Sequence, residues 1–150
     1  MKTRFEADPI DWKILALLQR DARITNTGLG KAVGLSASAV AARIRVMEEA
    51  GVIEGYSARV NARALGQEIT AFIRVRTPHD KIKQCLKAFA AMPEILEAHR
   101  IAGDDCFMVK ASFSEMPHLE ATLDALARFG PVTTSLVLDS YPPKPLQARK

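Results

Sequence analysis

Apolar side chains recur at helical spacing along the first third of the chain. Two stripes stand out, one made of Ile10, Ile14, Leu17 and Leu18 and the other of Val40, Ile44 and Met47. Residues three or four positions apart share one face of an α-helix, so each stripe marks the buried side of a helix. We expect these helices to pack around one small core.

Local signals set the ends of the helices. Asp8 is an N-cap followed by a proline at the first helical position. A second helix is expected over residues 25–33, a tight turn follows at Gly34, and Ser36 stands where the N-cap of the third helix belongs. Residues 52–60 then have the pattern of a short strand. This order is that of a winged helix-turn-helix, which presents one helix to the major groove of DNA.

The third helix is the candidate reading helix, the one expected to contact the bases. Ser38, Ala42 and Arg45 project from the face opposite its apolar stripe. Small side chains let a backbone come close to another surface, and Ser or Arg can bond base edges or phosphates. An Ala-rich helix with a few arginines is also an ordinary surface helix, so in isolation the pattern leaves both interpretations open. The predicted DNA contacts are Ser36, Ser38, Ala42, Arg43 and Arg45, with Arg23 and Lys31 holding phosphates.

Two glycines interrupt the second helix. Gly28 and Gly30 each cost a helix interior about 1 kcal/mol relative to alanine. The sequence therefore predicts that Gly28→Glu or Gly30→Ala stabilises the fold, provided that neither glycine has a positive φ.

The second half of the chain alternates strand and helix periods in the order β-α-β-β-α-β. Strands are expected over residues 69–75, 95–101, 106–113 and 132–139, with helices over 82–92 and after Ser114 as an N-cap. Gly103-Asp104-Asp105 joins the two middle strands as a hairpin. The pattern predicts a ferredoxin-like unit, and with the N-terminal helices it makes the chain an α+β protein.

Composition and charge change this picture little. Residues 1–63 hold ten Lys/Arg against seven Asp/Glu, and residues 64–150 hold eleven against ten. The mild positive excess therefore lies on the proposed DNA-binding half. No signal-peptide or membrane-span pattern is present, so we expect a cytoplasmic protein with no membrane partner. Cys85 and Cys106 form neither a zinc pattern nor a disulfide framework, and the proline-rich segment 142–150 reads as a frayed tail.

Five segments in this order and spacing resemble the Lrp/AsnC, or feast/famine, regulators. They are DPIDWKILALL from Asp8, DARIT from Asp21, VGLS from Val33, VAARIRVME from Val40 and GVIEGYSARVN from Gly51. The resemblance continues through the C-terminal half. It implies a winged helix-turn-helix DNA-binding domain over residues 1–62. It also implies a ferredoxin-like, ACT-like effector-binding and oligomerisation domain over residues 63–150, which dimerises through paired sheets and assembles further, up to an octamer.

The family's effector turn lies between the second and third strands of this domain. Here the turn reads Gly103, Asp104, Asp105, Cys106 and Phe107. Glycine lets the backbone approach a ligand, and a carboxylate can pair with an amino-acid ammonium group. Thr133 and Ser135 share one face of the last strand and are predicted to complete the pocket. Gly-Asp-Asp is also ordinary hairpin chemistry, and Cys106 stands where many family members carry an acidic residue.

The resemblance therefore implies a sequence-specific DNA-binding transcription regulator that an amino acid or related metabolite modulates. One alternative is an architectural DNA-binding protein with no effector. Another is an enzyme, because sirohaem decarboxylases look like the same fold and use histidines. His79, His99 and His118 fall in separate expected elements, and no nucleophile with a base, phosphate loop or metal cluster is apparent. We therefore expect no enzymatic activity, no cofactor and no metal.

Overall fold

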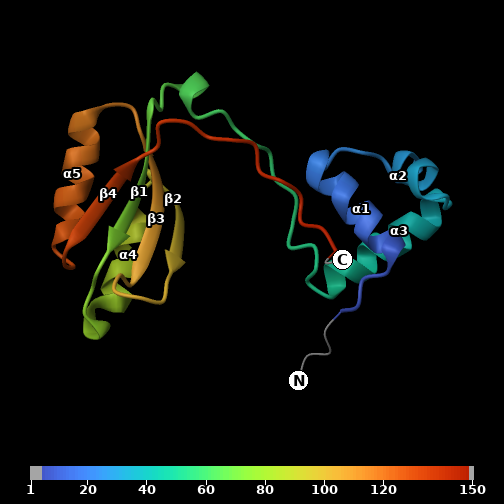
Figure 1. The fold of residues 1–150 in the computed structure, drawn as a ribbon, viewed down its shortest axis with the longest axis horizontal. Helices are drawn as coiled ribbons and strands as arrows, with labels where there is room; N and C mark the ends of the chain where they lie inside the picture. Colours follow the sequence, from blue (N-terminus) through green and yellow to red (C-terminus); the bar gives the residue numbers. More distant parts are fainter. Residues whose placement is uncertain (1–4, 149–150) are drawn as a thin grey trace. The chain divides into compact units, whose positions relative to one another are not determined.

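The computed structural model describes residues 5–148, which fold into two units (Figure 1). The first unit holds the chain up to Arg59 together with the segment from Pro142 onward, and the second is Val60–Tyr141. No helix in the described residues is long and apolar enough to cross a membrane.

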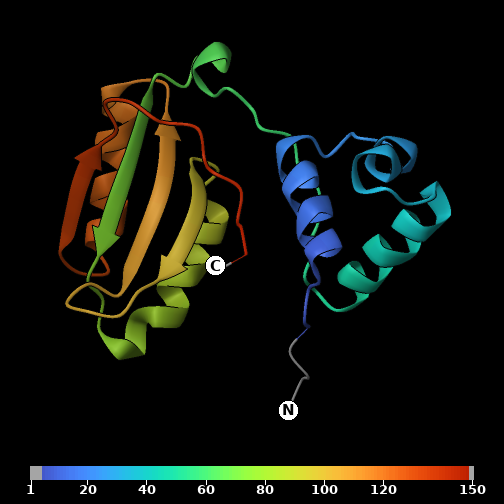
Figure 2. The ribbon, with the colours of Figure 1, turned by 45° about the vertical axis from the view of Figure 1, so that its right-hand side comes forward.

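The first unit is a bundle of three short helices (Figure 2). They are α1 (Pro9–Arg20), α2 (Asn26–Val33) and α3 (Ala37–Glu49). The core residues come from all three helices: Ile14, Leu29, Val40 and Met47 are fully buried. The apolar stripes predicted from the sequence are confirmed as the inward faces.

Each of the three helices has a side-chain N-cap, as predicted for the first and third, while Thr25, predicted as the first residue of the second helix, caps it instead. Asp8 Oδ1 accepts the backbone N–H groups of Ile10 and Asp11, both at 2.8 Å. Thr25 Oγ1 accepts the Gly28 N–H at 3.0 Å, and Ser36 Oγ accepts the Ala39 N–H at 3.2 Å. These bonds satisfy backbone donors that a helix start leaves unpaired, so the helix starts are fixed locally.

The turn between α2 and α3 depends on two glycines. Gly34 has a φ of 76°, the left-handed conformation that glycine adopts at low cost. Gly30 is buried, and a Cβ added to it would lie 2.4 Å from the backbone oxygen of Leu35. The structure therefore predicts that Gly30→Ala destabilises the fold, the opposite of the effect expected from helix propensity, which does not account for the close approach of the turn.

The segment expected to form a wing strand is not a strand. Residues 52–60 follow α3 and pair with no strand of the described chain. A strand needs a neighbouring edge for its backbone donors and acceptors, and a three-helix bundle supplies none.

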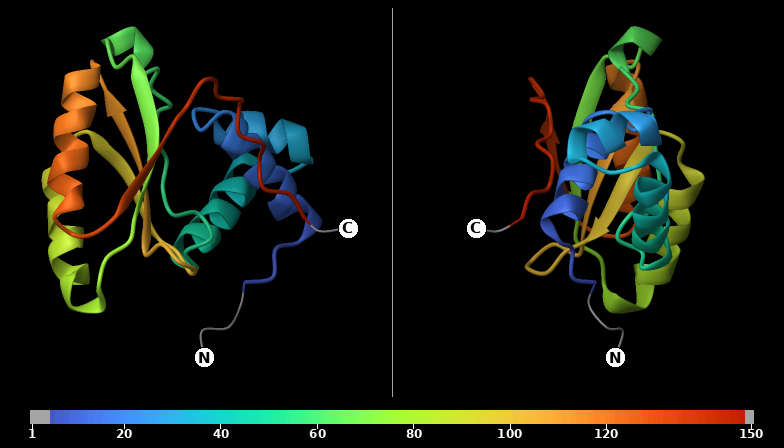
Figure 3. Two further views of the ribbon diagram at one scale, coloured as in Figure 1. Left: turned by 60° about the vertical axis from the view of Figure 1, so that its left-hand side comes forward. Right: turned by 90° about the vertical axis from the view of Figure 1, so that its right-hand side faces the viewer.

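The second unit is a four-stranded antiparallel sheet in the order β2-β3-β1-β4. Its elements are β1 (Ile69–Val75), α4 (Ile82–Ala91), β2 (Ile95–Arg100), β3 (Phe107–Phe113), α5 (Met116–Ala127) and β4 (Val132–Leu136), with short 3₁₀ turns at Arg63–Leu65 and His79–Lys81. Both helices cover the same face of the sheet, and the other face carries no helix of this unit (Figure 3). The predicted β-α-β-β-α-β order is confirmed.

The core of the second unit lies between the sheet and these helices. Alternate residues of β1 and β3 meet side chains of α4 and α5, as the strand alternation predicts. The buried residues are Ala71, Ile73, Val75, Cys85, Phe89, Phe107, Val109, Ala111, Phe113, Leu119 and Leu126.

The start of α5 and the end of β4 differ from the prediction for reasons that the structure shows, and the other predicted boundaries of this unit agree to within one residue. Ser114 does not cap α5, which begins at Met116 after Glu115 with no side-chain cap bond. Pro117 in the first turn supplies a helical φ without such a cap. The last strand ends at Leu136 instead of Asp139, because its partner β1 pairs with it only as far as Ala71.

The segment from Pro142 was predicted to fray, but one residue of its described part is bonded to α1. The Leu146 N–H donates to Gln19 Oε1 at 2.7 Å, and Gln19 Nε2 donates to the Leu146 carbonyl at 3.2 Å. One side-chain amide of α1 thus holds both main-chain groups of a single tail residue.

Candidate DNA-binding and ligand-binding sites

The exposed face of α3 matches the predicted reading face. Ser38, Ala42 and Arg45 are all exposed, and Ser36 is exposed at the N-terminus of the helix. Ser36 Oγ lies 3.1 Å from Ser38 Oγ, so the two hydroxyls form one polar patch beside the N-terminal N–H groups. A helix N-terminus attracts phosphate, and small side chains leave the backbone open to a groove.

Arg45 is the longest side chain on this face. Its side chain is 79% exposed, and its Nε donates to Glu49 Oε1 at 2.8 Å, one turn further along the helix. Exposed pairs of this kind contribute at most about 1 kcal/mol. The guanidinium is therefore available to exchange Glu49 for a base or a phosphate.

Arg43 has a different environment from the other predicted contacts. Its Nη1 donates to Asp8 Oδ2 and to Asp11 Oδ1, both at 2.7 Å. Asp11 is buried, and its other oxygen accepts the Asp8 N–H at 3.1 Å, so the pair also forms the capping box of α1. Arg43 therefore joins the reading helix to the N-terminus of α1.

This cluster changes the titration of its members. The pKa of Asp8 is below its usual value, first because the Asp11 N–H and then because the Arg43 guanidinium bonds its charged form. The pKa of Arg43 is raised by the same two carboxyl groups, Asp11 contributing more than Asp8. The charge of Arg43 is thus already balanced within the unit.

Arg23 and Lys31, the predicted phosphate contacts, are both exposed. Lys31 lies on α2, and Arg23 lies in the connection before it. The Arg23 backbone N–H donates to Asp21 Oδ1 at 2.9 Å, which shapes this connection and leaves the guanidinium outside that bond.

In the second unit, the predicted effector turn closes the hairpin between β2 and β3. Gly103 has a φ of 128°, a conformation that favours glycine. Asp104 is exposed, while the Asp105 side chain is 21% exposed and lies 3.6 Å from Arg74 Nη1. The Cys106 thiol donates to the Thr77 carbonyl at 3.1 Å, and this bond holds the last part of the turn next to Thr77.

Phe107 does not reach the surface of this turn. It is 1% exposed, and its ring meets the Phe89 ring edge to face at a centroid distance of 5.3 Å. A ring in this position supports the hairpin from within the core.

Thr133 and Ser135 are exposed on the sheet face that the helices leave open. Thr133 pairs with Arg74 on β1, and Ser135 pairs with Phe72. The structure therefore brings Asp105, Arg74 and Thr133 together at one end of the sheet. Arg74 was not predicted as a site residue. The alternation of β1 places it on the exposed face of the strand, and this pattern could have identified it as a candidate.

A helix-turn-helix unit with an exposed reading helix, followed by a ferredoxin-like unit with a polar turn, defines a two-domain transcription regulator. The comparisons agree. A winged helix-turn-helix DNA-binding model matches residues 8–54, and the Lrp/AsnC ligand-binding domain matches residues 70–146.

Relatives of known sequence match most of the chain. The leucine-responsive regulatory protein of Rhizobium meliloti is 46% identical over 114 residues, covering 73% of this chain and 72% of the relative. The uncharacterised HTH-type transcriptional regulator YezC of Bacillus subtilis is 39% identical over 137 residues, covering 89% and 94%. Among solved structures, the transcriptional regulator NMB0573 of Neisseria meningitidis in complex with L-Met has a TM-score of 0.85 and 28% identity, covering 93% of this chain and 94% of its own.

The chain belongs to the Lrp/AsnC family of DNA-binding transcription regulators.

Proposed function

We propose that this regulator binds DNA sequence-specifically through the exposed face of α3 and that an amino acid modulates the binding. The observation that carries the first half is the exposed row of Ser38, Ala42 and Arg45 on the reading helix. The ion pairs of Arg43 with Asp8 and Asp11, called the Arg43 clamp below, hold that helix against α1. In this proposal Arg45 reads a base edge, Ser36 and Ser38 bind at the helix N-terminus, and Arg23 and Lys31 hold phosphates. Arg43 positions the helix.

The modulating ligand is proposed to bind at the end of the sheet beside the 103–106 turn. Asp105 supplies a carboxylate for an ammonium group, Arg74 a guanidinium for a carboxylate, and Thr133 a hydroxyl. These three groups suit both charged ends of an α-amino acid. The L-Met complex of the Neisseria relative supports this ligand class. The Cys106 thiol donates to the Thr77 carbonyl, so we propose that Cys106 shapes the turn and does not pair with a charged group of the ligand.

We also propose that the protein works as a homodimer that pairs the open faces of two sheets. Phe72 is 39% exposed on this face and Met108 is partly buried beside it, which leaves apolar surface among polar neighbours. Two reading helices related by a two-fold axis would match half-sites about one turn of DNA apart.

Fluorescence anisotropy tests both halves of the proposal. Labelled DNA from upstream of the protein's own gene is compared with a random duplex of equal length at fixed salt, with and without pooled amino acids. Preferential binding that the pool shifts supports the proposal. Equal binding to both duplexes would favour an architectural DNA-binding protein, and preferential binding that the pool leaves unchanged would refute the effector half.

Arg45→Ala identifies the reading helix in the same assay. Loss of a base contact should weaken binding to the upstream DNA by about 1–3 kcal/mol and leave random DNA nearly unaffected. Arg128→Ala, an exposed arginine just after α5, is the matched control and should change neither affinity. An equal loss on both duplexes would refute base reading by Arg45.

A further inference from the structure

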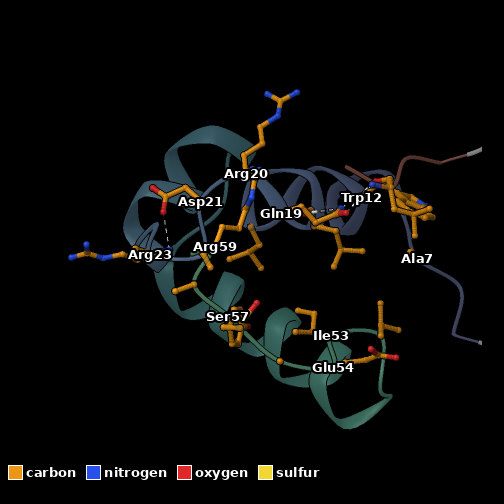
Figure 4. A pocket seen from close by; sticks show the side chains of 18 of the residues that line it. Ala7, Trp12, Gln19, Arg20, Asp21, Arg23, Ile53, Glu54, Ser57 and Arg59 are labelled. Atoms are coloured by element: carbon orange, nitrogen blue, oxygen red, sulfur yellow. Dashed lines mark hydrogen bonds between the residues drawn. The ribbon is translucent and has the colours of Figure 1, made fainter. Parts of the chain in front are cut away.

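The first unit has a large groove on the side of α1 that faces the segment 52–59. Its volume is about 1000 Å³, and Trp12, Leu15, Gln19 and Ile53 are among the residues that line it. Trp12 and Gln19 lie on α1, and Ile53 and Glu54 lie on the segment opposite them (Figure 4). A three-helix core covers only one side of α1, so this second, partly apolar side needs another occupant.

The structure places the C-terminal tail at this groove. Leu146 is one of its lining residues, and its backbone N–H and carbonyl are both bonded by Gln19. Gln19 Nε2 also donates to the Leu15 carbonyl at 3.2 Å, so the amide is oriented by its own helix. Because the Gln19 amide bonds both the N–H and the carbonyl of one residue, it sets which residue of an extended peptide lies at this point. Main-chain hydrogen bonds set the register in the same way when a peptide adds to the edge of a sheet.

The composition of the tail suits this arrangement. Pro142, Pro143 and Pro145 precede Leu146, and such a run is stiff and extended. The residues from Val137 to Pro145 follow β4 directly and span at most about 30 Å. This stiff segment therefore links β4 covalently to the residue that Gln19 holds.

The other end of this connection reaches the reading helix. Gln19 lies on α1, whose N-terminus is bonded through Asp8 and Asp11 to Arg43 of α3. The covalent and hydrogen-bonded path thus runs from β4, which carries Thr133, through the tail and α1 to α3. Leu146 is 71% exposed, so its bonds are in contact with water and release at low cost.

We propose that the C-terminal tail is a releasable strap that docks in the α1 groove through Leu146 and Gln19. The strap couples ligand binding in the second unit to the DNA affinity of the first. This inference rests on the proposed amino-acid response, and it assigns that response a physical route.

Two variants remove the docking contact without removing the tail. Gln19→Ala deletes the amide at an exposed helical position where alanine is a good helix former, so the unit stays folded. Leu146→Pro deletes the N–H that Gln19 Oε1 accepts. The matched controls are Gln84→Ala, at an exposed site on α4, and Lys144→Pro, which stiffens the tail but keeps the Leu146 N–H.

Docking has a direct readout because Trp12 is the single tryptophan of the chain and lines the groove. Acrylamide quenching of its fluorescence should rise in Gln19→Ala and in Leu146→Pro and stay at the wild-type level in both controls. Equal quenching in all five proteins would overturn the docking. Protection that disappears on dilution would assign the groove to the tail of a second copy and would overturn a strap within one chain.

Coupling is measured by DNA anisotropy with L-methionine and L-leucine as probes. Coupled sites change an affinity by about fivefold or more. We expect that change in the wild type and both controls, and its loss in the two docking variants, with DNA binding in the absence of amino acid retained. A change that persists in the docking variants would overturn the strap. A wild-type protein that binds DNA without any change would instead refute the effector half of the proposed function. The proposed coupling would then be refuted together with the effector half, while the quenching of Trp12 would still show whether the tail docks in the groove.

Discussion

Replacing Gly30 by alanine tests whether the turn of the helix-turn-helix is set by backbone contact. Alanine is favoured over glycine in a helix interior by about 1 kcal/mol. An added Cβ at Gly30 would lie 2.4 Å from the Leu35 backbone oxygen, and no real Cβ comes so close. Leu35 cannot move alone, because the next residue is the N-cap Ser36 of α3. The substitution must therefore shift the start of the reading helix.

The expected size follows from these two opposing effects. Forced repacking costs about 1–3 kcal/mol, and the upper part of that range applies because the contacted atom belongs to the backbone. After the gain in propensity, Gly30→Ala should destabilise the first unit by about 1–2 kcal/mol. For a domain of this size that lowers the Tm by roughly 4–8 °C per kcal/mol.

Urea unfolding followed by Trp12 fluorescence reports on this unit. Gly28→Ala is the matched control, because its added Cβ would meet Ile24 Cγ1 at 3.2 Å and Thr25 Oγ1 at 3.3 Å, both on side chains that can adjust. We expect it to change the free energy of unfolding by less than about 1 kcal/mol. A Gly30→Ala protein as stable as the wild type would refute the importance of the backbone contact.

Three further predictions concern the clamp and the hairpin. Arg43→Ala should lower the urea midpoint of the first unit and weaken binding to specific and random DNA alike, because it leaves the buried Asp11 without its cation; a loss confined to specific DNA would show that Arg43 reads bases. Because the pKa of Asp8 is lowered in the folded state, its contribution to stability is complete above the ordinary carboxyl value of 3.8 and is lost as the pH falls through the folded pKa. Acid titrations should therefore show a smaller stability loss below about pH 4 in Asp8→Asn than in the wild type, and parallel curves would contradict this. Phe107→Ala should destabilise the second unit by about 3–5 kcal/mol in thermal unfolding, whereas a stable variant with altered amino-acid binding alone would place the ring in the ligand site.

Much of the fold follows from short-range sequence signals. Asp8 and Ser36 cap helices through bonds that span only two or three residues, so the sequence around each one is sufficient to locate the helix start. The period-two alternation of β1 likewise identifies the buried face of the sheet without any knowledge of its neighbours.

The failures involve contacts between residues that are distant in the sequence. The strand expected over residues 52–60 lacks a partner edge, a property of the surrounding structure that the segment itself does not encode. Arg43 has the same local pattern as Arg45, yet only Arg43 meets two carboxylates of α1. Arg74 belongs to the candidate ligand site because the register of the sheet places it beside Thr133 and near Asp105, and the sequence of β1 alone does not show this.

The sequence by itself determined the helices, the four strands of the sheet, their order, their buried faces and the family, because these depend on periodicity and on caps a few residues long. Only the tertiary structure decided that Gly30 has no room for a methyl group, that Arg43 clamps two helices, and that Gln19 holds Leu146. Each of these depends on atoms that folding brings together across a turn, between helices, or across most of the chain. Local propensity contains no information on such distances.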